Sequence, residues 1–174
     1  AVPGQAMEEI QIVHAAQRYG AHVFDLLRPY VGKRVLEVGA GIGTMSRRLA
    51  DSADMVIGIE PNVNCATRAR DAMHGHPRFS LRVCHLEECD PGELRSQRFD
   101  TVVCVNVLEH IADDVDALRT FKDILVPGGR VLIFVPAVQA AYGPLDAELG
   151  HHRRYSKASL GKTFADASLD VQVL

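Results

Sequence analysis

The 174-residue sequence has no tryptophan, and aromatic residues make up only 6% of it. A binding surface of large stacked aromatic rings is therefore not expected. No apolar run approaches the ~20 residues that span a bilayer, and the first residues lack a signal-peptide pattern, so we expect no membrane partner. The formal net charge of -3 lacks the basic excess that usually accompanies binding to a phosphate backbone, which argues against nucleic acid as a partner.

Cysteine is also scarce. The four cysteines include no CxxC pair and lack zinc-finger spacing to the histidines. Cys84 and Cys104 alternate with valines in strand-like runs, which predicts that they are small buried hydrophobic side chains. This usage predicts a protein of the reducing cytoplasm.

Short apolar runs alternate with amphipathic segments along the chain. Apolar residues at helical spacing over 7–30 predict one or two helices, and near-continuous Val/Ile/Leu runs predict strands buried on both faces. Strand and helix alternate through short connections, without an internal repeat or linker, which is typical of a one-domain α/β sandwich with right-handed crossovers. The predicted strands cover 34–38, 55–60, 79–85, 99–107 and 130–137, and the helices between them include 44–53, the stretch up to Met73, and a segment stopped by Pro127-Gly128-Gly129.

Sheets of this kind bind ligands at the carboxyl ends of their strands, where the winding direction switches. The chemistry is therefore expected directly after the first four strands. These places hold Glu37–Gly43, Glu60, His85–Glu87 and Asn106–His110.

The first of these places is part of VLEVGAGIGT, residues 35–44. A glycine loop between a strand and a helix lets backbone N–H groups approach a ligand, although a turn can also need glycine only for its positive φ. Glu60, about twenty residues further on at a strand end, is placed to accept both hydroxyls of a ribose. A nucleoside ligand is therefore favoured.

The spacing of the glycines separates two kinds of nucleoside. The dinucleotide fingerprint is G-x-G-x-x-G, but here the third glycine comes one place early, at Gly43, and Thr44 takes the place of the last glycine. Glu37 would repel a pyrophosphate, whereas it would attract an ammonium or a sulfonium. A cationic nucleoside is therefore favoured over a dinucleotide.

At this point the chain resembles the class I S-adenosylmethionine-dependent methyltransferases. The resemblance extends from about Tyr19 onward, and it is carried by RPYVGKRVLEVGAGIGTMSRRLA, FDTVVCVNVLEHI, LVPGGRVLIFVP and LGHHRRYSKASL. The first and last of these segments resemble bacterial small-molecule methyltransferases related to the ubiquinone-biosynthesis type.

This resemblance implies a fold. It is a Rossmann-like three-layer α/β sandwich with a mostly parallel, seven-stranded type of sheet. DVQVL (170–174) matches the sixth strand, and the last strand is missing from this chain. The whole of 1–174 would be one S-adenosylmethionine-binding domain, with residues 1–31 as an N-terminal helical cap and 138–158 as an insert on the substrate side.

The resemblance also implies the contacts of the cofactor, S-adenosyl-L-methionine. His85 stands where the family commonly has an Asp that binds the adenine amino group; a neutral imidazole can accept the same bond. The backbone N–H of Leu86 would bind a ring nitrogen, and Asn106 would face the methionine end or cap its loop. The remaining implied contacts are Glu37, Gly39, Ala40, Gly41 and Gly43 for the methionine part, Glu60 for the ribose hydroxyls, and Pro61 or Asn62 beside the adenine.

Methyl transfer from a sulfonium is an in-line displacement, so much of the barrier falls when the nucleophile is held about 3 Å from the methyl group. A general base is needed only if the acceptor must lose a proton, and histidine suits this role near pH 7. His110 in the LEH sequence and His152 in the HHRRY sequence are the catalytic candidates. His110 could instead pack the loop, and Arg153 and Arg154 could form structural salt bridges or hold an anionic group of the substrate.

Other polar residues receive plainer interpretations. Asp113, Asp114 and Asp116 lie where a helix begins, and acids there are favoured by the macrodipole, so we predict no metal site. Tyr19 and His14 belong to the N-terminal helices that the family folds over the cofactor, but we expect them to pack.

The sequence thus predicts methyl transfer from S-adenosylmethionine to a small-molecule acceptor, at a hydroxyl oxygen, and it allows a homodimer. Two alternatives stay open: a nicotinamide-dependent oxidoreductase, and a non-catalytic module that binds S-adenosylmethionine. No motif identifies the acceptor.

Overall fold

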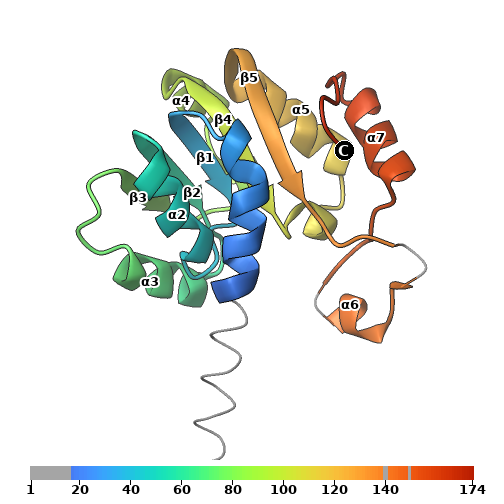
Figure 1. Ribbon diagram of the computed structural model, residues 1–174, viewed down its shortest axis with the longest axis horizontal. Coiled ribbons are helices and arrows are strands. Elements are labelled where there is room, and N and C mark those ends of the chain that lie inside the picture. The colour runs from blue at the N-terminus through green and yellow to red at the C-terminus, as the bar shows by residue number, and fades with distance from the viewer. Residues whose placement is uncertain (1–16, 139–140, 149) are drawn as a thin grey trace, which may run out of the picture.

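The computed structural model describes residues 17–138, 141–148 and 150–174, in which five parallel strands form one sheet in the order β3-β2-β1-β4-β5 (Figure 1). The first strand of the sheet, β1, is the central one; the chain then adds β2 and β3 on one side of it, and crosses back to add β4 and β5 on the other side. The winding therefore switches direction between β1 and β4, where sheets of this type open a crevice at their carboxyl ends. The strands are β1 Arg34–Val38, β2 Met55–Ile59, β3 Phe79–Arg82, β4 Phe99–Val105 and β5 Leu125–Phe134.

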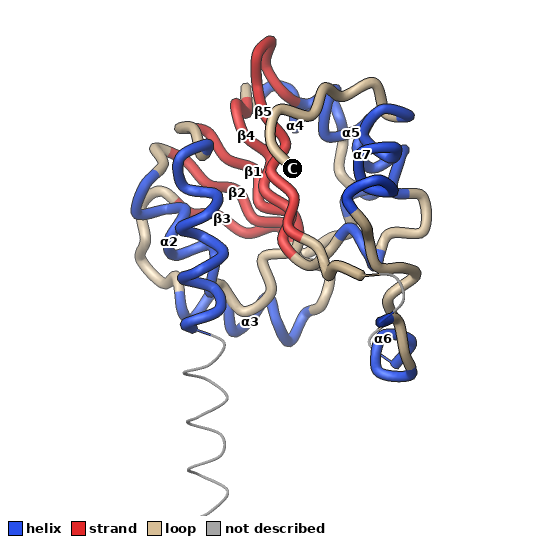
Figure 2. Tube along the Cα trace, turned by 45° about the vertical axis from the view of Figure 1, so that its right-hand side comes forward, coloured by secondary structure: helices blue, strands red, loops and turns tan. Residues whose placement is uncertain are grey.

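Helices cover both faces of the sheet, which gives three layers (Figure 2). On one face, Val23 of the helix over 17–27 and Leu49 of α2 belong to one buried apolar cluster. On the other face, Leu118 of α5 and Phe164 of α7 belong to a second cluster. The predicted Rossmann-like α/β sandwich is confirmed. The named helices are η1 Arg28–Tyr30, α2 Thr44–Ser52, α3 Val63–Ala72, η2 Leu86–Glu88, α4 Pro91–Ser96, η3 Leu108–His110, α5 Asp114–Ile124, α6 Pro144–Glu148 and α7 Lys157–Asp166.

Side-chain caps fix where two of these helices begin. The Asn62 side chain accepts hydrogen bonds from the backbone N–H groups of Asn64 and Cys65 at 3.0 and 3.1 Å, at the start of α3. Asp113 accepts one from the N–H of Asp116 at 2.9 Å, at the start of α5. Each cap satisfies a first-turn donor that has no partner inside the helix. The acidic run at Asp113 thus begins a helix, as predicted.

The strand ends differ from the prediction. β3 ends at Arg82, where it pairs with Ile59, because β2 ends there and offers no further ladder partner. The last predicted strand, 130–137, was placed too late, since β5 begins at Leu125 and ends at Phe134. Leu125 pairs with Phe99 and Arg130 with Thr101, so residues 126–129 bulge out of the ladder. The helix α5 already ends at Ile124, so the Pro127-Gly128-Gly129 run lies inside the range of β5 and not at the end of the helix.

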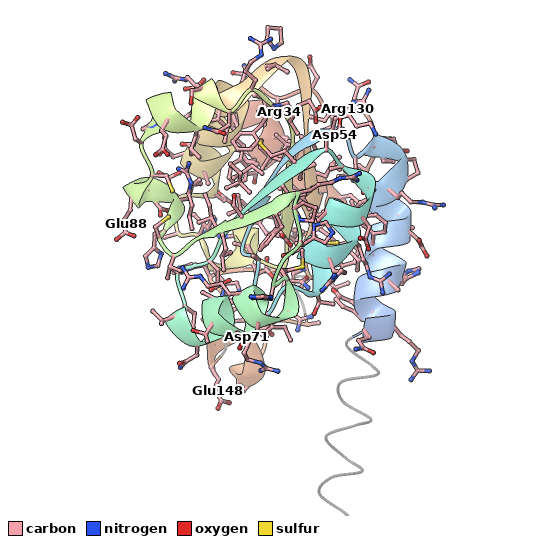
Figure 3. All side chains as sticks on the ribbon, turned by 90° about the vertical axis from the view of Figure 1, so that its left-hand side faces the viewer. Arg34, Asp54, Asp71, Glu88, Arg130 and Glu148 are labelled. Atoms are coloured by element: carbon pink, nitrogen blue, oxygen red, sulfur yellow. The ribbon has the colours of Figure 1, made fainter. Side chains whose placement is uncertain are left out.

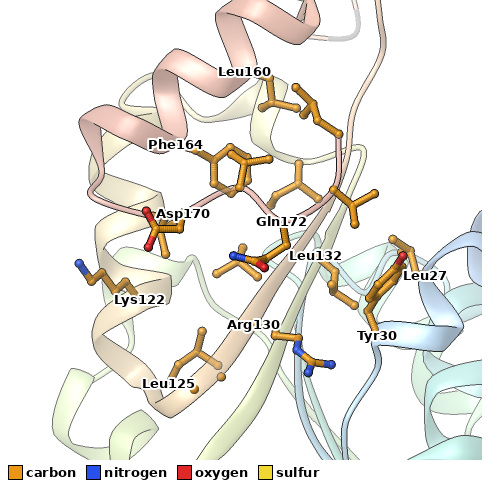
Figure 4. Close-up of a pocket in the computed structure, with 18 of the residues that line it drawn as sticks. Leu27, Tyr30, Lys122, Leu125, Arg130, Leu132, Leu160, Phe164, Asp170 and Gln172 are labelled. Carbon is orange, nitrogen blue, oxygen red and sulfur yellow. The ribbon is translucent and has the colours of Figure 1, made fainter.

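The sixth strand that DVQVL (170–174) was expected to form is absent from the described residues. Val171, Val173 and Leu174 are exposed, so the segment buries no apolar face that would fix its register against the sheet. It instead borders a groove of about 1110 Å³ that β5 also lines, as the position of Gln172 beside Leu132 shows (Figure 4). β5 is therefore the edge strand on its side of the described sheet.

The segment that follows β5 extends toward the carboxyl ends of the strands. In Figure 3, Arg34, Asp54 and Arg130 mark the amino ends of the strands at one end of the molecule, and Glu148 of α6 lies at the opposite end. A bridge between Ala137 and Tyr155 joins the two ends of this segment. None of the helices in the described ranges is long and apolar enough to cross a membrane.

Candidate active site

The turn between β1 and α2 is fixed at its start and borders open space at its centre. The backbone N–H groups of Gly39 and Ala40 donate to the carbonyl of Ile59 at 2.8 and 3.0 Å. Gly39 has a φ of +79°, and a Cβ there would clash with Cγ2 of Val107, so the turn packs directly on the loop after β4. A Cβ on Gly41, by contrast, would meet no described atom within 4 Å. The turn therefore leaves room beside its backbone for a ligand.

Gly43, at the end of this turn, meets α3 instead. Its φ is +87°, and a Cβ there would lie 3.3 Å from Cα of Ala69. A side chain at this position would have to displace backbone. The third glycine of the sequence pattern therefore permits close packing of two helices in this structure.

Glu60 closes the turn from the side of β2. The carboxylate is buried, and its two oxygens accept hydrogen bonds from the N–H groups of Gly41 and Asn62, both at 2.8 Å. A carboxylate can accept about four hydrogen bonds. The acid that was predicted to hold a ribose thus lies directly beside the glycine turn, with part of its acceptor capacity still available. Pro61, which follows it, is exposed.

Glu37 is buried next to the same turn, at 2% exposure. Its Oε2 accepts a hydrogen bond of 2.6 Å from the hydroxyl of Ser46, a buried residue of α2. Burial raises the pKa of the Glu37 carboxyl from its ordinary 4.5 to about 8; the Ser46 bond opposes this rise, and the charge of Glu60 adds to it. The carboxyl is therefore mostly protonated at pH 7, and a cation beside it would favour its ionised form.

Asn106 connects the loop after β4 to the N-terminal helix. Its side chain forms a reciprocal pair with the Tyr19 hydroxyl, with Nδ2 3.0 Å and Oδ1 3.3 Å from that oxygen. Asn106 has a φ of +52°, and its N–H donates to the carbonyl of Phe134 in β5 at 2.7 Å. The Tyr19 ring meets the Phe134 ring edge-on, with centroids 6.1 Å apart. Tyr19 thus packs against Phe134, as expected, and also contacts Asn106, a predicted cofactor residue. His14 lies outside the described residues.

His85 and Leu86 follow β3 and open η2. The Glu88 N–H donates to the His85 backbone carbonyl at 3.2 Å, and the Glu88 carboxylate accepts the N–H of His85 at 2.8 Å. The Leu86 side chain is buried. The backbone of His85 is therefore fixed at the start of η2, and the contact of its imidazole with adenine stays a prediction.

A second group of polar side chains surrounds His110, in η3. The His110 and His151 rings lie 4.6 Å apart, nearly perpendicular. His151 Nδ1 is 2.8 Å from Oδ1 of Asp146, which also accepts a 2.7 Å bond from Arg154 Nε. The Arg154 guanidinium holds the pKa of the Asp146 carboxyl well below its usual range. Burial lowers the pKa of His110, and the charge of His151 lowers it further, so His110 is neutral and able to accept a proton near pH 7.

His152 and the two arginines are arranged differently. His152 is exposed, and its backbone N–H donates to the Glu109 carbonyl at 2.7 Å. Its charge acts weakly on His110, so both catalytic candidates lie in one neighbourhood. Arg153 pairs with Asp114 at 2.7 Å. Arg154 pairs with Asp146, also at 2.7 Å. Both arginines therefore form structural salt bridges in this structure, which was one of the two roles considered for them.

The Glu109 carboxyl lies at the centre of this group and is fully buried. Neither of its oxygens has a hydrogen-bond partner among the described residues, and burial raises its pKa. Ligand atoms of Glu109, His110 and His151 all lie within 4.8 Å of one another. One carboxylate and two imidazoles are a donor set that suits a divalent transition metal, so these three residues could hold one.

Sequence reasoning did not find the roles of Asp146, His151 and Glu109. The HHRRY sequence pointed to a histidine pair, but nothing in it distinguished His151 from His152. The partner that distinguishes His151 is Asp146, five residues earlier in the sequence. An acid at that distance does not by itself identify a histidine partner.

The fold and the site define a Rossmann-like α/β protein with a glycine turn and two buried acids next to the switch point of the sheet. A sequence profile for the family described as methyltransferase domain matches residues 12–173. The chain belongs to this family.

Individual relatives give a finer comparison. The chain is 32% identical over 103 residues to a ubiquinone biosynthesis O-methyltransferase of Bradyrhizobium sp. (strain ORS 278), which is 59% of this chain and 39% of that protein. It is 38% identical over 113 residues to a tRNA U34 carboxymethyltransferase of Azotobacter vinelandii, with 64% of this chain and 35% of that protein covered. The chain thus spans less than half the length of these curated relatives.

Among solved structures, the N-terminal domain of EvdMO1 with SAH bound has a TM-score of 0.64 and 21% identity to this chain, and the match covers 85% of this chain and 70% of that one. This likeness supports the shared fold.

Proposed function

We propose that the protein transfers the methyl group of S-adenosylmethionine to a hydroxyl oxygen of a small-molecule acceptor. The observation that carries the proposal is the buried Glu37 carboxyl beside a glycine turn that borders open space. An ammonium or sulfonium bound next to this acid would lower its pKa and be stabilised by the ionised carboxylate, whereas the charge of a pyrophosphate would be repelled by the ionised form and would keep the acid protonated. The nicotinamide alternative is not supported by this arrangement.

The residues around the turn fit the donor. Glu60 has acceptor capacity left for ribose hydroxyls, and Gly41 leaves the space in which a ligand could contact the backbone. Asn106 and Tyr19 border the same end of the sheet. When bound, S-adenosylmethionine supplies a methyl group that is already activated on a sulfonium.

The polar group at His110 fits the acceptor side. A neutral His110 can take the proton that a hydroxyl loses as its oxygen attacks. His151, held by Asp146, lies against the His110 ring and can orient it. Positive charge on His110 would be balanced by the ionised form of Glu109, which has no other hydrogen-bonding partner among the described residues.

A small molecule is favoured over nucleic acid as the acceptor. The chain carries a formal net charge of -3, and both arginines next to His110 are paired with carboxylates. One relative is named as an O-methyltransferase of ubiquinone biosynthesis, whereas another is named for position U34 of tRNA. Paired arginines leave little positive charge for phosphates at this site.

Calorimetry with S-adenosylhomocysteine tests the cofactor half of the proposal. We expect binding by the wild type, and a loss of about 1–3 kcal/mol in Glu60→Ala because the ribose hydroxyls lose a charged acceptor. Asp123→Ala, which removes an exposed acid from α5, is the control and should bind as the wild type does. Absence of binding heat in the wild type would contradict the proposal.

A further inference from the structure

Two of the four cysteines lie close together beside the proposed adenine side of the site. Cys84 follows β3 and Cys89 follows η2, and their sulfurs are 3.1 Å apart. Both side chains are partly accessible. Cys104 is buried in β4, and Cys65 lies on α3. All four thiols are free in this structure.

The short turn between the two cysteines is fixed by its own hydrogen bonds. The two hydrogen bonds between His85 and Glu88 hold its start, and the N–H of Cys89 donates to the Leu86 carbonyl at 3.1 Å. The two sulfurs would need to move closer by about 1 Å to reach the S–S bond length of about 2.05 Å. The fold therefore holds the thiols in near-bonding positions that the sequence spacing, with four residues between them, did not reveal.

We propose that Cys84 and Cys89 form a reversible disulfide when the protein meets a low-molecular-weight disulfide oxidant. The thiolate of one cysteine attacks one sulfur of the oxidant, and the other oxidant sulfur leaves as a thiolate. The second cysteine then loses its proton and attacks the sulfur of the first, which expels the second oxidant thiol. In total, two protein thiols are oxidised, one oxidant disulfide is reduced, and two small thiols are released.

The contact between the two thiols does not distinguish one sulfur from the other, so either can make the first attack. Burial and the neighbouring Cys84 raise the pKa of Cys89. The Cys89 thiol also lies 3.5 Å from the His85 carbonyl, to which it can donate. The attacking form is in either case the thiolate.

The disulfide would enclose His85 and Leu86, the two residues that were predicted to contact the adenine. This consequence rests on the proposed function. The sulfurs approach each other by about 1 Å, and any part of this movement that is not taken up by rotation of the two side chains shifts the turn that carries these residues. We expect oxidation to weaken binding of S-adenosylhomocysteine by about three- to tenfold, which corresponds to about 0.7–1.4 kcal/mol.

Peptide mass spectrometry tests the disulfide without reference to any activity. Trypsin cuts after Arg82 and after Arg95, so both cysteines fall in the one peptide VCHLEECDPGELR. The folded protein is equilibrated with a series of oxidised-to-reduced glutathione ratios, alkylated and digested. We expect this peptide to lose two hydrogen atoms and to resist alkylation, while Cys104 remains unoxidised.

Three variants make the result specific. Cys84→Ser and Cys89→Ser should each abolish the internal disulfide, and Cys65→Ser should leave it unchanged; thermal unfolding confirms that each variant is folded. A wild-type peptide that remains fully alkylated at every ratio overturns the proposal. So does a disulfide that forms only with Cys65 or Cys104.

Calorimetry on the reduced and oxidised proteins then separates the two ideas. No binding to the reduced protein would refute the proposed function and leave the disulfide standing on its mass evidence. Binding to the reduced protein, with equal affinity after oxidation, would refute only the link between the disulfide and the adenine side.

Discussion

Glu37 is a residue whose charge state should change with pH near neutrality. Its pKa is raised by burial from 4.5 to about 8 in the folded chain. The folded state therefore holds this proton more tightly than the unfolded state, so the contribution of Glu37 to stability is fully present below about pH 4.5 and is lost as pH rises toward 8. We predict that Glu37→Gln removes this slope and unfolds at higher urea concentration than the wild type above pH 8.

Urea unfolding at a series of pH values from 5 to 9 checks this prediction. Ser46→Ala is a useful companion, because the Ser46 bond favours the ionised form: its loss should raise the folded-state pKa of Glu37 further and extend the pH-dependent loss of stability to higher pH. Parallel pH profiles for wild type and Glu37→Gln would show that the carboxyl does not titrate in this range.

The second prediction at this scale concerns His110. Burial lowers its pKa first, and the positive charge of His151 lowers it further. Replacing His151 by Asn removes that charge, so the pKa of His110 should rise toward the ordinary value of about 6.5. NMR titration of the histidine ring protons measures this directly, without an acceptor. His152→Asn should produce a smaller rise, since His152 is the weakest of the causes; a fall in either variant would contradict the arrangement of charges.

At the scale of elements, the β1–α2 turn depends on glycine for two separable reasons. Gly39 combines a φ of +79° with a Cβ position that clashes with Val107, whereas Gly128 has a φ of +81° and open space. We predict that Gly128→Ala costs about 1–2 kcal/mol of stability from φ alone. Gly39→Ala should cost about 1–3 kcal/mol more, because the clash displaces the loop after β4, and it should also weaken binding of S-adenosylhomocysteine. Equal losses in the two variants, measured by urea unfolding, would show that the contact with Val107 is unimportant.

The elements that the sequence predicted well are those set by local chemistry. β1, β2 and α2 follow from apolar runs and a glycine turn, which need no distant partner to be recognised. The bulge of residues 126–129 could not be read in the same way, because it depends on the pairing of Leu125 with Phe99 across the sheet. DVQVL alternates as a strand does, yet an alternating pattern forms a strand only where a face is buried, and Val171 and Val173 are exposed.

The candidate site shows the same division. Glu37 and Glu60 were identified because they lie at the carboxyl ends of two strands, and parallel strands bring these ends together. The Asp146–His151 pair and the buried Glu109 depend on how the segment after β5 folds back onto η3. Sequence alone supplied the histidines but not the neighbour that each one contacts.

At the scale of the whole molecule, one sheet separates two apolar clusters, and the proposed ligand site lies at the carboxyl ends of its strands. Leu49 belongs to the cluster under α2, and Leu118 belongs to the cluster under α5. Neither residue belongs to the turn or to the polar group around His110. Binding at the site should therefore stabilise the fold as a unit by mass action, whichever cluster has been weakened.

This argument gives a prediction about stability and binding together. Leu118→Ala should lose about 2–5 kcal/mol, because the side chain is fully buried and a cavity remains. S-adenosylhomocysteine at 100 times its Kd should then restore about 2.7 kcal/mol, the same amount that it adds to the wild type. In the double variant Leu118→Ala/Glu60→Ala, the same ligand concentration should restore only about 1.4 kcal/mol, because the Kd is expected to be tenfold weaker. Urea unfolding of the wild type and of both variants, each with and without ligand, measures these free energies. If the ligand stabilises Leu118→Ala and the double variant equally, the bound nucleoside does not contact the Glu60 carboxylate. If the ligand no longer stabilises Leu118→Ala, α5 and the site are coupled by more than mass action.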